Sequence, residues 1–284
     1  MRLSAKQSTT RMSHRKEWWQ TLCNHSPEYL MEAWGLGMFM VSAAVFTTLF
    51  EYPGSPVHQA LVDADIRRAL IGLAMGLTAV GIIYSPWGQQ SGAHLNPAVT
   101  LTFLRLGKIT VVDAAMYITA QFMGGLVGVL LSIRILGVAF VMPPVQYIVT
   151  LPGAGGVATA FLAELVISAA MMFTVLLISN SNRFGHITGL CAGALVALYI
   201  TFEAPLSGMS MNPARSFASA APGGMWEHLW LYFTAPVLGM LVGAELYCLL
   251  KSTAQVRCAK LDHSPTRRCI HCHYEAPDSS RQEA

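Results

Sequence analysis

The stretch SGAHLNPAVTL, residues 91–101, places a glycine, a histidine, an asparagine and a proline between two long apolar segments. A second stretch, SGMSMNPARSF at 207–217, repeats this pattern 116 positions later. Asparagine is a strong N-cap and proline suits the first turn of a helix, so Asn-Pro-Ala predicts the start of a helix. The two predicted helices, 96–104 and 212–220, are too short to cross a bilayer, which takes roughly 20 apolar residues.

Six further segments are apolar over a length sufficient to span a membrane: 29–50, 68–86, 112–136, 157–178, 186–204 and 228–250. Only 12% of the 284 residues are charged, against about 25% in a soluble domain. The formal net charge of +3 is too small to favour nucleic acid as a partner. We therefore expect an all-α integral membrane protein with six transmembrane helices and two re-entrant half-helices.

The two halves of the chain repeat each other at a nearly constant offset. GLAMGL at 72–77 resembles GLCAGA at 189–194, an offset of 117, and AQFMGGLVG at 120–128 resembles APVLGMLVG at 235–243, an offset of 115. Each half holds three spans, an odd number, so the second half must enter the membrane upside down. This predicts an inverted repeat with halves at 28–136 and 157–251, whose solute site lies near the midplane.

The residues before each Asn-Pro-Ala box are predicted to form loops that line a pore, because irregular backbone at membrane depth must be buried or face water. Inversion brings two helix N-termini, each carrying roughly half a positive charge, to the pore centre. Cations and protons meet a positive potential there, whereas a neutral molecule can accept hydrogen bonds from the asparagines. The residues predicted to form this part of the pore are Asn96, Pro97, Ala98, Asn212, Pro213 and Ala214 in the boxes, and Gly92, Ala93, His94, Gly208 and Ser210 in the loops.

Three charged residues are expected at membrane depth. Arg215 follows Asn212 by three positions, and an arginine there is costly and functional by default, so we expect it to repel cations and donate to solutes. Glu32 and Glu164 lie early in the first and fourth spans, at equivalent places in the repeat. We expect both to accept hydrogen bonds from loop N–H groups that lack a helical partner. A proton relay is disfavoured, because the positive pore centre opposes protons.

Together these features resemble the aquaporin (major intrinsic protein) family over residues 29–250. The resemblance rests on the two Asn-Pro-Ala boxes, the arginine after the second, the six spans and the symmetric glutamates. A single Asn-Pro-Ala tripeptide is a weak motif, but two in register with a repeat are specific. The resemblance implies an aquaporin-like fold, a passive channel that is not an enzyme and requires no cofactor, and a homotetramer with one pore per subunit.

The family divides into water channels and glycerol facilitators, and several positions resemble the water channels. Ser216 stands where facilitators usually carry aspartate. Ser219, Ala220 and the pair Tyr232 and Phe233 also match the water-channel pattern.

The positions that the resemblance assigns to the narrow filter are unusual for the family, which generally combines the arginine with an aromatic residue and a histidine. Here they are Met75 or Gly76, Ile200, Met209 and Arg215. Such a filter is apolar with one strong donor. We expect a channel for water, and the filter leaves open a second small neutral solute such as ammonia or glycerol.

Basic residues predict the orientation of the chain in the membrane. With both termini on one side, that side holds all of the 18 Lys and Arg residues except Arg67, Arg68, Arg134 and Arg215. The positive-inside rule then predicts cytoplasmic termini, in a plasma (inner) membrane. Residues 1–27, with five basic residues and Trp18-Trp19, are expected to be an interfacial anchor on lipid or a disordered tail, and 28–251 the channel domain.

The C-terminal tail, 252–284, is rich in cysteine and histidine. Cys258, His263, Cys269 and Cys272 have the residue types and a plausible spacing for a structural zinc site, in which His271 or His273 could replace one ligand. The run from Cys269 to His273 also matches the haem c attachment pattern, but that reaction needs the outer face of the membrane. A disordered tail with reduced thiols is the alternative to zinc.

Three alternative functions are less well supported, one of them an adhesion or junction protein built on the same fold. A secondary transporter of a small solute also uses inverted repeats and broken helices, but usually couples through intramembrane carboxylates. An enzyme is disfavoured, because no nucleophile and base are spaced for catalysis. His94 is expected at the cytoplasmic mouth of the pore and Glu203 at the outer mouth.

Overall fold

The computed structural model of the chain describes residues 3–263 and 266–275, with side chains from residue 20 onward. Within these residues the structure is almost entirely helical and contains no β-strand. Six helices are long and apolar enough to cross a membrane: α1 (Leu3–Glu51) from Gln20 onward, α3 (Ala64–Tyr84), α6 (Val111–Leu136), α8 (Gly156–Ser179), α9 (Thr188–Phe202) with the turn before it, and α12 (Leu229–Lys251). The predicted six-helix membrane fold is therefore confirmed.

The remaining helices are short. The two half-helices are α5 (Pro97–Arg105) and α11 (Pro213–Gly223), and short helical segments connect the spans: α2 (Pro56–Ala60), α4 (Pro86–Ser91), α7 (Val138–Val141), α10 (Ala204–Ser207) and the 3₁₀ turns Gln146–Ile148, Gly185–Ile187 and Thr253–Gln255.

Helix α1 begins far before the expected start of the first span, and it continues through Pro27. Proline has no N–H, so the Cys23 carbonyl one turn earlier loses its usual donor. The Ser26 hydroxyl donates to that carbonyl instead, at 2.9 Å. Because this hydroxyl replaces the missing N–H donor, the first span and the N-terminal segment can form a single helix.

Small residues allow three helix pairs to pack with their backbones in contact. A Cβ on Gly124 of α6 would lie 2.0 Å from the Ala33 carbonyl oxygen of α1, and one on Gly239 of α12 would lie 2.3 Å from that of Leu165 in α8. These two pairs occupy equivalent places in the repeat. The third pair, α3 with α9, joins the two halves, and a Cβ on Gly76 of α3 would likewise clash with the backbone of α9. Such small-residue contacts are the usual means of close packing in membranes.

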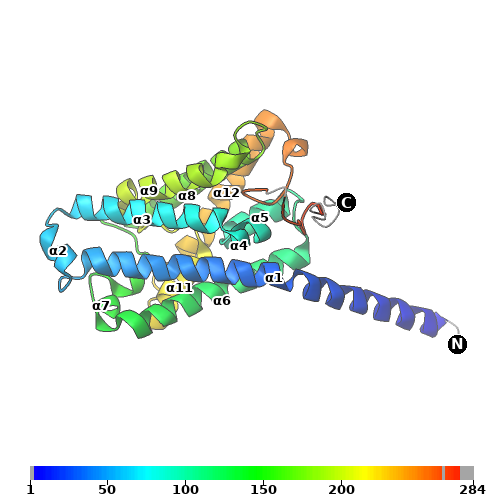
Figure 1. The fold of residues 1–284 in the computed structure, drawn as a ribbon, viewed down its shortest axis with the longest axis horizontal. Coiled ribbons are helices and arrows are strands. Elements are labelled where there is room, and N and C mark those ends of the chain that lie inside the picture. Colours follow the sequence, from blue (N-terminus) through cyan, green and yellow to red (C-terminus); the bar gives the residue numbers. More distant parts are fainter. Residues whose placement is uncertain (1–2, 264–265, 276–284) are drawn as a thin grey trace, which may run out of the picture.

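Each half-helix packs against a long helix of both halves, and α5 and α11 contact each other. The N-terminal part of α1 and the C-terminal tail lie at the same end of the bundle (Figure 1). We call this the tail end and the opposite one, where α2 lies, the far end. The arrangement brings the two interrupted stretches of sequence together inside the bundle.

Candidate pore

The loops before α5 and α11 have the same unusual backbone. In the first, Ala93 and Leu95 have positive φ angles of 52° and 51°, and in the second, Met209 and Met211 have 50° and 52°. A non-glycine residue in this left-handed region costs about 1–3 kcal/mol and needs support from its surroundings. Two buried carboxylates supply that support.

Glu32 of α1, fully buried, holds the first loop. One of its oxygens accepts from the Ser91 hydroxyl at 2.8 Å and from the His94 N–H at 3.0 Å, and the other accepts from the Leu95 N–H at 2.6 Å. Gln121 of α6 donates to the same carboxylate at 2.8 Å. Without this carboxylate, the N–H groups of His94 and Leu95 would be unpaired polar groups inside the bundle.

Glu164 of α8, also fully buried, holds the second loop in the same way. Its carboxylate accepts from the Ser207 hydroxyl at 2.7 Å and from the N–H groups of Ser210 and Met211 at 2.6 and 2.7 Å. The three donors stand 116 positions after those of the first loop. The inverted repeat is therefore kept at the level of single hydrogen bonds.

One tyrosine fixes the start of each loop, a role that the sequence did not predict for either Tyr117 or Tyr232. Tyr117 of α6 donates its hydroxyl to the Ser91 carbonyl at 2.7 Å, and Tyr232 of α12 donates to the Ser207 carbonyl at 2.6 Å. Both are fully buried. Their separation of 115 positions matches the repeat offset, which is the signal that could have identified them.

The asparagines of the two boxes bond across the centre of the bundle. The Asn96 amide donates to the Met211 carbonyl and the Asn212 amide donates to the Leu95 carbonyl, both at 2.7 Å. Each side-chain oxygen caps its own half-helix, since it accepts from Ala98 or Ala214 at 2.9 or 3.0 Å. An amide NH₂ carries two hydrogens, so each asparagine keeps one donor beyond the cross-bond. Pro97 and Pro213 occupy the first helical positions.

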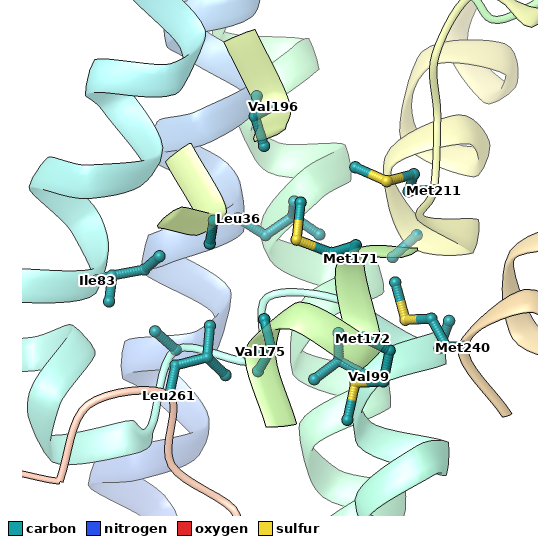
Figure 2. Close-up of a cluster of buried hydrophobic side chains, with 14 of the residues drawn as sticks. Leu36, Ile83, Val99, Met171, Met172, Val175, Val196, Met211, Met240 and Leu261 are labelled. Atoms are coloured by element: carbon teal, nitrogen blue, oxygen red, sulfur yellow. The ribbon is translucent and has the colours of Figure 1, made fainter. Parts of the chain in front are cut away.

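A cavity of about 570 Å³ runs through the bundle beside these loops. It extends from Glu51 and Arg68 at the far end to Leu261 of the tail. Asn96 and Asn212 both line it. Most of its wall is aliphatic or methionine side chain, several of which are drawn in Figure 2, including Leu36, Ile83, Val99, Met171, Met172, Val175, Val196 and Met240. Such a wall offers few competing partners, so a solute would find polar groups mainly along the loops.

The predicted loop and filter residues divide between those that line the cavity and those that do not. Ala93, His94, Gly208, Ser210, Met209, Met75, Ile200 and Arg215 line it. Of the two alternatives left open on α3, Met75 lies on the cavity, whereas Gly76 lies against α9, where a Cβ would be 2.5 Å from the Gly193 carbonyl oxygen. Gly92 does not line the cavity, because residues 259 and 260 of the tail pack against it.

Arg215 lies one turn after the second asparagine cap, and its backbone N–H donates to the Asn212 side-chain oxygen at 3.2 Å. Its guanidinium donates to the Ile148 carbonyl at 2.8 Å, which holds one end of the side chain at the cavity wall. Ile148 and the neighbouring Val145 and Val149 also line the cavity, although they come from the connection between the two halves. Sequence reasoning did not identify this connection, because no motif marks it. Its role depends on the path of the chain in three dimensions.

The four predicted zinc ligands come together in the tail. One ligand atom from each of Cys258, His263, Cys269 and Cys272 lies within 4.8 Å of the others. Sγ of Cys258 is 3.3 Å from Sγ of Cys269, and Nε2 of His263 is 3.2 Å from Sγ of Cys272. We call these four residues the tail cluster. All six cysteines of the chain are free, so the cluster contains no disulfide.

The electrostatics of the tail cluster favour a thiolate. The Cys258 thiol donates to Cys269 and lowers the pKa of the Cys269 thiol far below its ordinary value, with further help from His263 and Lys260. Lys260 itself is 3% exposed. Burial lowers the pKa of its ammonium, while negative charge on Cys269 acts in the opposite direction.

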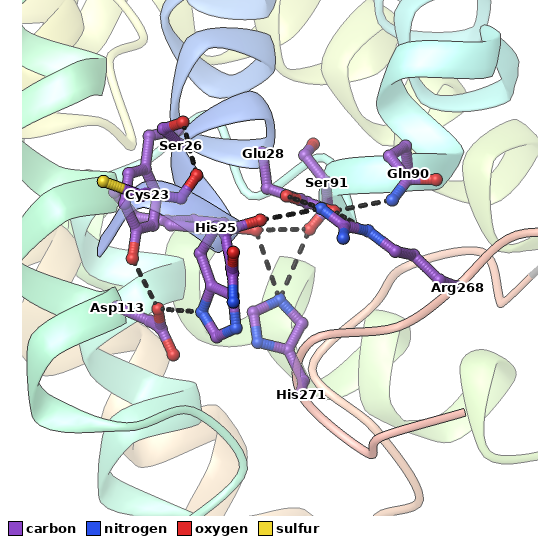
Figure 3. A network of polar contacts seen from close by, with 12 residues as sticks. Cys23, His25, Ser26, Glu28, Gln90, Ser91, Asp113, Arg268 and His271 are labelled. Carbon is purple, nitrogen blue, oxygen red and sulfur yellow. Dashed lines mark hydrogen bonds and ion pairs between the residues drawn. The ribbon is translucent and has the colours of Figure 1, made fainter. Parts of the chain in front are cut away.

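The tail is bound firmly to the tail end of the bundle, as Figure 3 shows for part of the contact. Arg268 forms an ion pair with the fully buried Glu28 of α1, with Nη2 to Oε2 at 2.9 Å, and Gln90 of α4 donates to the same carboxylate at 2.6 Å. The imidazole of His271 lies 3.4 Å from the Ser91 carbonyl and stacks on that of His94, with ring centroids 5.8 Å apart. Of the alternative zinc ligands, His271 therefore packs against the channel.

Comparisons with known proteins agree with this architecture. A model of the major intrinsic protein family matches residues 24–247. Aquaporin NIP3-1 of Arabidopsis thaliana is 37% identical over 216 residues, covering 73% of this chain and 65% of the relative. Aquaporin NIP2-2 of Zea mays is 32% identical over 219 residues, covering 76% and 72% of the two chains.

The crystal structure of the aquaglyceroporin from Plasmodium falciparum has the same fold. Its TM-score is 0.66 at 21% sequence identity, and the match covers 78% of this chain and 95% of that one. The resemblance drawn from the two Asn-Pro-Ala boxes is thereby confirmed. The chain is a multi-pass integral membrane protein that belongs to the major intrinsic protein family of channels for water and small neutral solutes.

Proposed function

We propose that water and small neutral solutes cross this channel through the cavity between the two Asn-Pro-Ala boxes. The observation that carries the proposal is the reciprocal bonding of Asn96 and Asn212 at a continuous cavity of about 570 Å³. The N-termini of α5 and α11 both face this point, so their dipoles add a positive potential there. A cation or proton is repelled, whereas a neutral molecule can accept from the free amide hydrogens.

Solute choice is assigned to the filter of Met75, Ile200, Met209 and Arg215. Three apolar side chains and one guanidinium suit a molecule with both a nonpolar surface and a hydrogen-bond acceptor. Water needs only the donor, and glycerol or ammonia also fits this description. We therefore propose conduction of water together with at least one of these solutes.

The structure offers no support for ion-coupled transport through the predicted carboxylates. Glu32 and Glu164 each accept at least three hydrogen bonds from the loops or their flanks. Taking up a proton would weaken the bonds that support four residues with positive φ. Their contacts support a structural role in a passive channel.

The family and the distribution of basic residues support a proposal for where the chain lies in the cell. We propose cytoplasmic termini in a plasma (inner) membrane, with 28–251 as the channel domain between the N-terminal segment 1–27 and the tail 252–284. We also propose a homotetramer with one pore per subunit, because apolar side chains such as Leu73, Leu162 and Leu249 face outward from the bundle. These faces suit both lipid and neighbouring subunits.

We propose that the tail cluster binds one zinc ion as a structural site, separate from the pore, which requires no cofactor. A tetrahedral site with Zn–S bonds of about 2.3 Å separates its ligand atoms by about 3.8 Å. The distances of 3.3 Å and 3.2 Å within the cluster, and its overall span of 4.8 Å, lie around this value. Three thiolates and one imidazole form a common ligand set for structural zinc.

Stopped-flow light scattering of proteoliposomes tests the channel. The full chain, freed of metal with a chelator, should shrink faster than protein-free vesicles under an osmotic gradient, and Ile200→Trp should abolish the difference by filling the cavity. Leu198→Trp is the matched control, because this side chain on the same helix is 50% exposed at the outer surface. Gradients of glycerol and of ammonia rank the solutes. Metal-free vesicles no faster than protein-free ones would contradict the proposed function.

A further inference from the structure

The tail segment between Cys258 and Asp262 enters the pore at the tail end. Leu261 lines the same cavity as the asparagines and the filter, and is 7% exposed. Figure 2 shows its side chain pointing toward the region of Ile83 of α3, Val99 of α5 and Val175 of α8. All four belong to one buried apolar cluster. The tail thus supplies one apolar wall of the cavity at this end, and apolar constrictions in a pore can stop flow by excluding water.

The tail also occupies polar groups that a solute would need. The Leu261 N–H donates to the Gly92 carbonyl at 3.1 Å, and His94 donates from Nε2 to the Ala259 carbonyl at 2.5 Å. Nδ1 of His94 is 3.0 Å from the Thr100 hydroxyl, so both ring nitrogens are engaged. A molecule arriving at this mouth finds the first carbonyl and the histidine already paired.

The tail cluster sets the position of this inserted segment between Cys258 and Asp262. Cys258 directly precedes Ala259, and His263 follows Leu261 by two residues, so two of the four ligands flank the inserted segment. The other two, Cys269 and Cys272, lie on either side of His271, which packs on His94. Lys260 donates from Nζ both to the Gln89 carbonyl of α4 and to the Arg268 carbonyl, each at 2.9 Å. A metal ion bound here would tie the inserted segment to the part of the tail that holds it against the channel.

A metal ion has a route to the cluster without passing through the pore. A second cavity, of about 540 Å³, lies between the tail and the connection of α8 to α9. It is lined by Cys258, His263 and Cys272. Binding and release can therefore occur at the surface while the channel stays embedded.

We infer that the tail is a zinc-dependent closure of the channel, which holds Leu261 in the mouth when the metal is bound and frees the mouth when it is removed. This inference rests on the proposed channel function and zinc site. It assigns a regulatory role to residues that the channel itself does not require. Without metal, the tail keeps the Arg268 ion pair and the hydrogen bonds of Lys260, Leu261 and His94 but loses the metal's four-ligand link, so its open state becomes more populated.

Full-length protein in proteoliposomes, loaded with Zn²⁺ or stripped by a chelator on both faces of the membrane, tests the inference. Zinc-loaded wild-type protein should bind about one zinc per chain. Its water permeability should be about tenfold or more below that of the stripped protein. Cys269→Ser should be permeable in both conditions, whereas Cys23→Ser, at an exposed cysteine outside the cluster, should behave as wild type. Leu261→Ala retains all four ligands, so it should bind zinc and still conduct.

The possible failures are distinguishable. Equal permeability with and without zinc, or the absence of near-stoichiometric zinc from the wild type, overturns the closure while leaving the channel in place. Higher permeability with zinc than without it overturns the closure as well. If stripped wild type, Cys269→Ser and Leu261→Ala all match protein-free vesicles, the proposed channel function fails, and the closure with it.

Discussion

Arg268 and Glu28 are 240 positions apart in the chain and form a two-point ion pair, with Nε to Oε1 at 3.0 Å and Nη2 to Oε2 at 2.9 Å. The carboxylate is fully buried, whereas the arginine is 48% exposed. The pair joins the tail to the first helix next to the pore mouth. Its strength therefore bears on how tightly the tail is docked.

We expect Arg268→Ala to loosen the tail without unfolding the channel. Glu28 would keep Gln90 as a donor but lose its charged partner, at a cost of about 1–3 kcal/mol. Amide hydrogen exchange should accelerate over residues 256–275 and stay unchanged in α3 and α9. Arg267→Ala, the change at the neighbouring arginine, is the matched control. Uniform acceleration throughout the bundle would contradict a local role.

The buried glutamates should matter far more than an exposed one. Glu32→Gln or Glu164→Gln replaces one accepting oxygen by a donor that faces loop N–H groups, which should cost about 2–3 kcal/mol each. Water permeability of the metal-free protein should fall with the loss of loop geometry. Glu245→Gln removes an exposed ion pair with Arg105 and should change stability by less than about 1 kcal/mol. Thermal unfolding in detergent measures the difference, and equal effects at all three sites would contradict the assignment.

Arg215 should act mainly as a barrier to charge. Removing its positive charge in Arg215→Ala lowers the electrostatic barrier by about 3 kcal/mol, or roughly a hundredfold in proton leak. A pH-sensitive dye inside metal-free proteoliposomes measures the leak, and water flow should persist. Arg134→Ala, at an exposed site on α6, is the control. A proton leak no larger than that of the control would show that the asparagine caps suffice.

Because α1 and α6 pack with their backbones in contact, a larger residue at Gly124 should destabilise the protein. Gly124→Ala places a Cβ 2.0 Å from the Ala33 carbonyl oxygen, so the helices must separate, at a cost of about 1–3 kcal/mol or more. Gly81→Ala meets no atom within 4 Å, and should stabilise its helix by about 0.5–1 kcal/mol. Thermal unfolding of the two variants in the same detergent should therefore shift in opposite directions.

Glu203, just beyond the end of α9, should make stability depend on pH. Burial raises the pKa of its carboxyl from 4.5 to about 7, and neither oxygen accepts a hydrogen bond from the described residues. The folded state thus binds the proton more tightly than the unfolded state. Stability is highest below pH 4.5 and falls as the pH rises to about 7. Glu203→Gln should remove this slope in thermal unfolding, and a slope that persists in the variant would assign it to another group.

Much of the fold follows from local sequence. The long apolar segments, the small residues that let helices touch and the capped starts at Asn96 and Asn212 all depend on neighbours along the chain. The repeat offset also places Glu32 and Glu164 at matching positions. The choice between Met75 and Gly76 could not be made in this way, because one insertion shifts a helix by about 100° and changes which side chain faces the pore.

In the tail, too, the sequence predicts some features and only the tertiary structure decides others. The ligand types and spacing of Cys258, His263, Cys269 and Cys272 are visible in the sequence and predict a metal site. Nothing in the sequence predicts that Leu261 lines the pore, because that contact depends on how the tail folds back across helices more than 80 residues away.

By itself, the sequence determined the helical membrane fold, the inverted repeat and the identity of the asparagines that meet at the centre of the bundle, since these rest on hydrophobic length, capping and periodicity. The tertiary structure decided the reciprocal bonds between the two loops, the choice of Met75 over Gly76 on the cavity wall, and the docking of the tail at the mouth. These contacts join segments distant in the chain. Their free energy comes from packing and from the pairing of buried polar groups, and neither leaves a local pattern in the sequence.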